Sequence, residues 1–156
     1  MHEDYITVVK VEPGREPYIT AIKNTLEAKQ AEVGGLIQFI PYEISSGETY
    51  ALICSDEGKL NGEPYNRCLF DRRTGKPFDI VCGDFIVCNA YPDSDEFNSL
   101  TREDAEKIIR EFPPEVFMEC ADGSVAVMKQ SDLDRYLQRQ PAPAASLDYD
   151  FYEDER

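Results

Sequence analysis

The chain has 156 residues, 42% of them hydrophobic, which fits one domain that buries about 70% of the surface its unfolded chain exposes. It carries 31 acidic against 16 basic residues, and this net charge of −15 disfavours direct binding to a nucleic-acid backbone of the same sign. No segment approaches the roughly 18 apolar residues that span a bilayer, and no signal segment opens the chain, so we expect a cytoplasmic protein without membrane contact.

Alternating apolar and polar residues mark the first third of the chain. They predict four strands, over 5–11, 18–23, 36–44 and 49–54. Between the second and third strands, Thr25 is placed to cap a short helix over 26–33. That helix ends at Gly34, because glycine readily adopts the left-handed conformation of a C-terminal cap. We expect the last two of these strands to pair as a hairpin.

The middle of the chain continues with strands and then the clearest helix. Strands are predicted over 66–71 and 78–90, the second interrupted at Gly83 by a bulge or tight bend. Thr101 and Asp104 then form a capping-box-like helix start, with apolar residues recurring on one helical face up to Phe112.

Past the two prolines that stop this helix, residues 115–130 predict a hairpin, and Ser131 is placed to cap a last short helix ending at residue 139. We therefore predict a single α+β domain over 1–140, with an antiparallel or mixed sheet and two to three short helices. Residues 141–156 form a Pro/Ala linker and an acidic, aromatic tail that we expect to be disordered when free.

Three segments carry a resemblance to a known family: "QAEVGG" at 30–35, "EGKLNGEPYNR" at 57–67 and "GDFIV" at 83–87. With the order of the strands around them, the chain resembles domain-of-unknown-function family 3846 over roughly residues 5–112. The resemblance implies an origin in bacterial phages, plasmids or conjugative elements, often near antirestriction genes, and it assigns no catalytic residues. The hairpin and helix over 115–140 lie outside it.

Catalytic machinery is sparse in the sequence. The single histidine, His2, is terminal, so a histidine-based triad or zinc site is not expected. The five cysteines contain no CxxC pair and are predicted to be reduced core residues, the alternative being a thiolate site. "TGK" at 74–76 lacks the flanking residues of a phosphate-binding loop. We expect a non-enzymatic protein without cofactor or metal; an enzyme using carboxylates or one cysteine is the third alternative.

The stretch from 59 to 77 has five basic residues against two acidic ones, a local charge of +3 in an acidic chain. An arginine fork, flanking glycines and two asparagines favour a site for a nucleotide-like anion. The candidate ligand-binding residues are Lys59, Asn61, Asn66, Arg67, Arg72, Arg73 and Lys76. The alternative is a long turn whose arginines pair with nearby acids.

A second candidate site is the acidic surface. Residues 92–122 have a net charge of −7, from ten acidic and three basic residues, and the tail from 141 adds −4. Candidate partner-binding residues are Asp93, Asp95, Glu96, Glu103, Asp104, Tyr149, Phe151 and Tyr152. We expect an acidic protein of a bacterial mobile element, possessing a counter-defence or nucleic-acid-mimicking role, that occupies a basic host protein. One alternative is that the acidic charge serves solubility alone. Another is a small-ligand-binding protein that uses residues 59–76. The sequence does not determine the oligomeric state.

Overall fold

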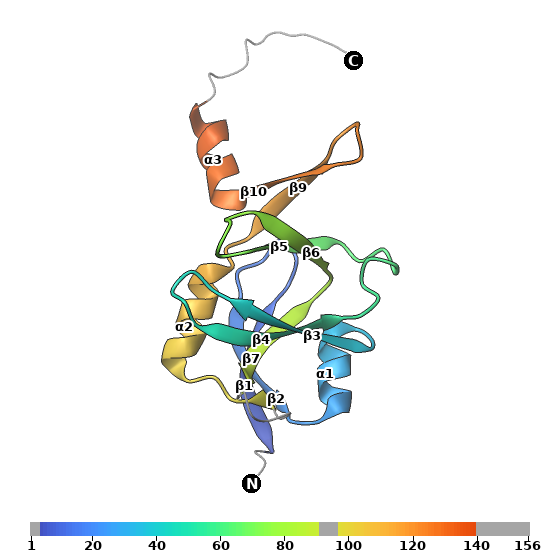
Figure 1. Cartoon of the computed structure of the whole chain (residues 1–156), viewed down its shortest axis with the longest axis vertical. Helices are drawn as coiled ribbons and strands as arrows, with labels where there is room; N and C mark the ends of the chain where they lie inside the picture. The colour runs from blue at the N-terminus through green and yellow to red at the C-terminus, as the bar shows by residue number, and fades with distance from the viewer. Residues whose placement is uncertain (1–3, 91–96, 140–156) are drawn as a thin grey trace.

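A computed structural model describes residues 4–90 and 97–139, which adopt the predicted α+β fold (Figure 1). The strands are β1 (Tyr5–Val11), β2 (Tyr18–Lys23), β3 (Ile37–Glu43), β4 (Thr49–Ser55), β5 (Tyr65–Phe70), β6 (Pro77–Cys82), β7 (Phe85–Ala90), β8 (Phe97–Asn98), β9 (Glu115–Glu119) and β10 (Val125–Lys129). The helices are α1 (Leu26–Val33), α2 (Arg102–Glu111) and α3 (Gln130–Arg139). None of these helices is long and apolar enough to cross a membrane.

The main sheet has the strand order β2-β1-β7-β4-β3, with β8 beside β7, and every pairing is antiparallel. The predicted hairpin of β3 and β4 is confirmed. The predicted strand over 78–90 divides at Gly83, whose φ of 81° is available to glycine at little cost. Its two halves join different sheets, because β6 pairs with β5 whereas β7 lies between β1 and β4.

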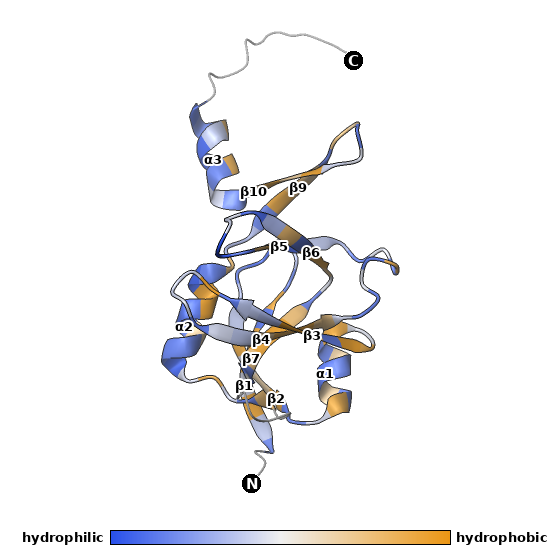
Figure 2. Cartoon of the chain, viewed as in Figure 1, coloured by the Kyte–Doolittle hydropathy of each residue, from blue (hydrophilic) through white to orange (hydrophobic). Residues whose placement is uncertain are grey.

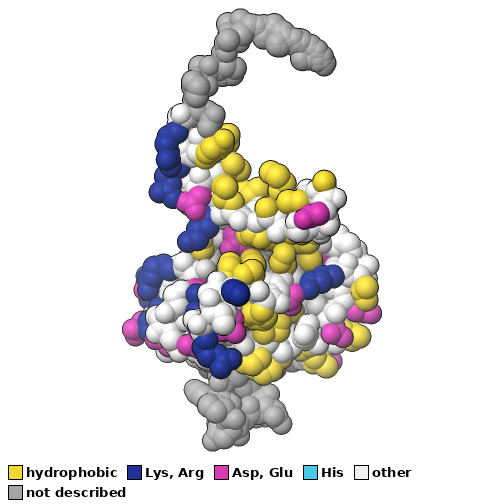
Figure 3. All heavy atoms as spheres, turned by 45° about the horizontal axis from the view of Figure 1, so that its top comes forward, with side chains coloured by type: hydrophobic (Ala, Val, Ile, Leu, Met, Phe, Trp, Pro, Cys, Tyr) yellow, Lys and Arg dark blue, Asp and Glu magenta, His cyan; other side chains and the backbone are white. Residues whose placement is uncertain are grey.

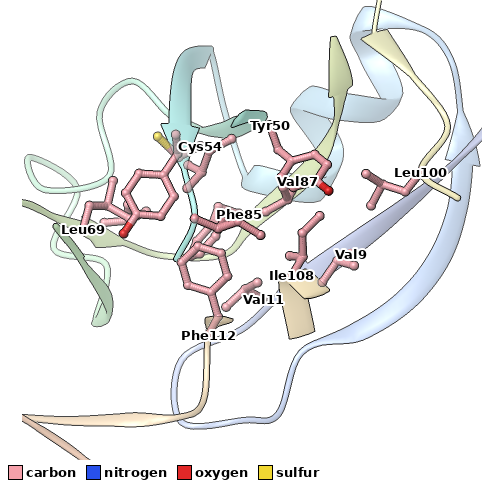
Figure 4. Packing of buried hydrophobic residues seen from close by; sticks show 14 of the residues in the cluster. Val9, Val11, Tyr50, Cys54, Leu69, Phe85, Val87, Leu100, Ile108 and Phe112 are labelled. Atoms are coloured by element: carbon pink, nitrogen blue, oxygen red, sulfur yellow. The ribbon is translucent and has the colours of Figure 1, made fainter. Parts of the chain in front are cut away.

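Two hydrophobic clusters hold the main sheet, one on each face. On one face, α1 packs over Val8, Ile53 and their neighbours. On the other face, α2 contributes Ile108 to a larger cluster in which the rings of Phe85 and Phe112 lie 5.5 Å apart (Figure 4). Figure 2 shows hydrophobic residues concentrated in the strands between the two helices. Burial of these side chains at about 25 cal/mol per Å² is the main stabilising contribution to the fold.

The start of α2 is the predicted capping box. The Thr101 side chain accepts a hydrogen bond from the Asp104 backbone N–H at 3.1 Å, and the Asp104 carboxylate accepts from the Thr101 backbone N–H at 3.4 Å. The Tyr50 hydroxyl also donates to Asp104, at 2.6 Å. The cap therefore attaches the helix to strand β4 of the main sheet.

The last described segment, residues 115–139, is called the C-terminal unit below. It comprises the hairpin of β9 and β10 with α3 packed against it, and it projects beyond β5 and β6 (Figure 1). The Tyr65 hydroxyl donates to Glu119 at 3.0 Å, and the Tyr65 and Phe117 rings lie 5.3 Å apart, which joins the unit to β5. The prediction that Ser131 caps α3 is wrong, because α3 begins at Gln130 directly after β10.

Candidate functional site

Two of the predicted ligand-binding residues, Asn66 and Arg67, lie inside the protein. Both have a relative exposure of 0%. The Asn66 side-chain amide donates to the carbonyl oxygens of Val11 at 2.9 Å and Gly83 at 2.8 Å. Its Oδ1 accepts from Nη1 of Arg67 at 2.8 Å. Asn66 therefore links β1, the β6–β7 bend and Arg67, and its polar atoms face protein groups.

The Arg67 guanidinium is surrounded by backbone carbonyl oxygens. Nε and Nη2 donate to Phe112 at 3.2 and 3.1 Å, Nη2 donates to Arg15 at 2.6 Å, and Nη1 donates to the Asn66 carbonyl at 3.0 Å. Burial lowers the pKa of Arg67, but arginine stays charged in proteins. The prediction that Asn66 and Arg67 face a ligand is corrected: they join the β1–β2 loop, β5 and the end of α2.

The other basic candidates do not gather into one site. Arg72 forms an ion pair with Glu111 and donates to the Glu43 carbonyl at 3.0 Å, as the paired-arginine alternative predicts. Arg73 is exposed, with Nε 3.9 Å from Asp71. Asn61 and Lys76 are also exposed. Lys59 forms an ion pair with Asp79 of β6, which raises the Lys59 pKa.

A cleft of about 380 Å³ lies between the 56–60 loop and β6, and Lys59 is the one basic candidate that lines it. The cleft wall also includes Asp56 and Asp79, so an anion would meet two carboxylates beside one paired ammonium group. Gly58 fits closely there, because a Cβ at this position would lie 2.6 Å from the Cys82 carbonyl oxygen. The cleft is poorly suited to the nucleotide-like anion predicted for this stretch.

Four of the five cysteines are core residues as predicted, and the prediction is wrong for Cys120. Cys54, Cys68, Cys82 and Cys88 are buried as free thiols, and Cys120 is exposed. Burial raises the pKa of Cys54 to about 11 and of Cys88 to about 12, so these thiols stay protonated at neutral pH. Within residues 4–90 and 97–139, no three His, Cys, Asp or Glu side chains are grouped to hold a metal ion.

The acidic candidates are described in part. Glu103 is 81% exposed and lies 3.7 Å from Lys107. Asp104 is occupied by Tyr50, Thr101 and Asn89 in the helix cap, so it serves the fold. The remaining candidates lie outside the described residues: Asp93, Asp95, Glu96, Tyr149, Phe151 and Tyr152.

The C-terminal unit presents the apolar surface that the sequence reasoning missed. No α3 residue is buried, and the exposed fractions are 66% for Met118, 45% for Met128, 56% for Tyr136 and 57% for Leu137. Figure 3 shows hydrophobic side chains gathered over the hairpin and α3, with basic side chains along the other side of α3. The signal was present in "VFME" and "VAVM", which are apolar on both faces of their strands.

Two hollows adjoin this apolar surface, one on each face of the hairpin. A groove of about 410 Å³ lies between the β5–β6 hairpin and the β9–β10 hairpin. Its lining includes Tyr65, Phe78, Val125 and Val127. A smaller hollow of about 140 Å³ under α3 is lined by apolar residues. Its lining consists of Val116, Met118, Ala126, Val127, Met128 and Leu133.

Comparison with known proteins finds one family, which covers the part of the chain before the C-terminal unit. Residues 6–113 match the family described as "Domain of unknown function (DUF3846)", as the resemblance implies. Neither the curated proteins nor the solved structures contain a significant match. The match ends at residue 113, immediately before the C-terminal unit. It covers well over half of the chain, so the protein belongs to the DUF3846 family.

Proposed function

We propose that the protein is a non-enzymatic binding protein that attaches to a basic partner protein through the C-terminal unit. One observation carries this proposal: four large apolar side chains of that unit are 45–66% exposed. Contiguous exposed apolar surface on a soluble protein is typical of a protein–protein contact. Methionine and tyrosine are also enriched in such contacts.

The net negative charge of the chain favours a positively charged protein as the partner. The described residues carry 22 acidic and 15 basic side chains, a net charge of −7, and the remaining −8 of the total −15 lies in the other residues. Such a field attracts cationic proteins and repels nucleic acid. The resemblance to a family of mobile elements supports a narrower hypothesis, in which the partner is a host nucleic-acid-handling protein that the acidic chain occupies.

The alternative of a small-anion site over 59–76 has less support. Two of its seven residues are buried among backbone carbonyls, and Lys59 and Arg72 are ion-paired. It nevertheless makes a separate prediction, because a small ligand held in the cleft beside Lys59 would survive high salt better than a charge-driven protein partner.

A pull-down from bacterial lysate tests the proposal with the full-length protein. We expect a basic protein to be captured at about 0.15 M salt and largely lost at about 1 M, where the screening length falls from about 8 to about 3 Å. The double variant Met118→Gln/Leu137→Gln should lose the same protein. The matched control is Leu60→Gln, which changes a side chain that is 85% exposed but lies in the 56–64 loop, outside the C-terminal unit.

Two results would contradict the proposal. One is capture of the same protein by the double variant and the wild type alike. The other is a small molecule, identified by mass spectrometry, that is retained at both salt concentrations and lost in Lys59→Met.

A further inference from the structure

The hairpin of β9 and β10 leaves one strand edge unpaired within the described residues. β10 pairs with β9 alone. The Cys120 N–H donates to the Ser124 carbonyl and the Gln130 N–H donates to the Pro114 carbonyl, each at 2.8 Å. Hydrogen-bonded pairs recur at every second residue of an antiparallel ladder, so the even-numbered residues of β10 face β9.

The odd-numbered residues of β10 therefore direct their backbone groups away from the hairpin. Val125 and Val127 present two N–H and two C=O groups along the open edge, and Lys129 adds its N–H, because the Lys129 carbonyl lies at the start of α3 and accepts the first hydrogen bond of that helix. Such an edge is a template for another strand. Only Lys129, at its end, is charged, and β10 contains no proline.

Other edges of the molecule carry protection that β10 lacks. Strand β3 contains Pro41, which has no N–H to offer a neighbouring strand. On β5, the Cys68 N–H donates to the Glu115 carboxylate at 2.8 Å and the Phe70 N–H donates to the Tyr42 hydroxyl at 3.1 Å. Of these three strand edges, β10 is the one without such protection.

Both faces of the hairpin favour the same conclusion. Val125 and Val127 line the 410 Å³ groove on one face, and Ala126 and Met128 line the 140 Å³ hollow under α3 on the other. A strand that is apolar on both faces is typical of the middle of a covered sheet. A two-stranded hairpin alone is marginally stable in water, so a third strand added at β10 would stabilise this sheet.

We infer that the open edge of β10 binds an extended segment of the partner, which adds an antiparallel or parallel strand to the β9–β10 sheet. This inference rests on the proposed function and names how the partner is held. The partner segment alternates apolar with basic residues. Successive side chains of a strand point to opposite faces, so its apolar side chains enter one of the two hollows beside β10 and its basic side chains lie on the other face, while backbone hydrogen bonds supply sequence-independent affinity.

Charge favours this occupant over a second copy of the chain. The C-terminal unit has five acidic and three basic residues, and residues 140–156 immediately after it add a net −4. The acids of the unit are Glu115, Glu119, Asp122, Asp132 and Asp134. Two copies would each bring a net charge of −15 to the contact, whereas a lysine-bearing strand would be attracted.

Amide hydrogen exchange of the full-length protein tests the inference, with a short synthetic peptide of alternating valine and lysine as the probe. We expect the peptide to slow exchange at Val125, Val127 and Lys129 by roughly tenfold or more, with smaller changes at Ala126 and Met128, which already bond to β9. The same peptide carrying N-methyl groups on the backbone nitrogens of alternate residues keeps its charge and side chains but loses those backbone N–H donors. It should not slow amide exchange in β10. A peptide with glutamate in place of lysine should not bind.

A matched pair of variants tests the edge from the protein side. Val127→Pro removes an N–H that points away from β9, so the hairpin keeps its hydrogen bonds. It should abolish protection by the peptide, and Val127→Thr, which keeps the N–H and the β-branched shape, should retain it.

Three results would overturn the inference: equal binding of the N-methylated peptide, protection at other strands only, or protection that grows with protein concentration without peptide, which would assign the edge to a second copy. If Val127→Pro still captures the basic protein that Met118→Gln/Leu137→Gln loses, the inference fails while the proposed function stands.

Discussion

The surroundings of Arg67 and the surface of the C-terminal unit reverse the usual distribution of side chains. Arg67, an always-charged residue, is 0% exposed, whereas Met118 is 66% exposed. Each exception has a different meaning. The buried guanidinium is satisfied by backbone carbonyls, so it explains how the fold is held, while the exposed methionine has no such explanation within the described chain.

This comparison separates stability from function. A buried charged group is tolerated only when its hydrogen bonds are made, and removal of one partner leaves the others unsatisfied. An exposed apolar side chain contributes little to folding, and a contiguous surface of such side chains is typical of a contact with another molecule. We therefore expect substitutions at the first region to change unfolding free energies and substitutions at the second to change binding.

The largest effect is expected for Arg67→Met. It removes donors to the carbonyls of Arg15 and Phe112 and should lower the free energy of unfolding by at least about 3 kcal/mol. Chemical denaturation measures this, with Arg73→Met as the control, because Arg73 has a 90% exposed side chain and should change stability by less than about 0.5 kcal/mol. An Arg67→Met protein of normal stability would show that the buried network is not what holds these segments.

The sequence predicted the local features of the fold well, because they depend on neighbouring residues. The capping box at Thr101 and the break at Gly83 are examples, each readable within a few positions. The burial of Arg67 was not predictable in this way. Apart from Asn66, its acceptors lie 45 to 55 residues away in the chain, and a loop rich in glycine and asparagine gives no sign that carbonyls from Glu12 and Phe112 converge on it.

The apolar surface of the C-terminal unit was not predicted from the sequence, for a related reason. Alternation is the usual signal of a half-buried strand, and β10 shows apolar residues at successive positions, which is typical of a strand covered on both faces. Whether another part of the chain covers it is a property of the tertiary structure. The exposure of Met128 and Leu137 could be known only after the strands were placed.

The second largest effect is expected for Gly58→Ala, on the loop that closes the cleft. The new Cβ would lie 2.6 Å from the Cys82 carbonyl oxygen, a backbone atom that cannot move alone. We expect a loss of about 2 kcal/mol in the free energy of unfolding. Gly35→Ala is the control, because its Cβ would lie at an ordinary 3.5 Å from Ser55 Oγ. Equal stability of the two variants would show that the loop adjusts freely and is not fixed against β6.

A smaller, pH-dependent effect is expected for Asp104→Asn. Burial raises the pKa of Asp104, but hydrogen bonds from Tyr50, Thr101 and Asn89 outweigh it, so the pKa lies below its ordinary value. This stabilisation is present above the unfolded pKa of about 3.9 and is lost as the pH falls through the folded value. The variant should therefore be about 1 kcal/mol less stable at pH 7, and the difference should shrink below about pH 4.

Chemical denaturation of the wild type and of Asp104→Asn, at several pH values from about 7 to below about 4, measures this difference in the free energy of unfolding. Glu103→Gln is the matched control in the same helical turn, because the Glu103 side chain is 81% exposed. A difference between Asp104→Asn and the wild type that stays constant down to acidic pH would assign the effect to shape and not to the charged hydrogen bonds.

The smallest effect on stability is expected for Met118→Gln/Leu137→Gln, which makes it the sharpest test of the comparison. Both side chains are more than half exposed, so the free energy of unfolding should change by no more than about 0.5 kcal/mol per substitution. Partner capture should nevertheless be lost, because the apolar contact is removed. If the variant instead unfolds as readily as Arg67→Met, the apolar surface of the C-terminal unit belongs to the folding core, and its exposure cannot be explained by a partner.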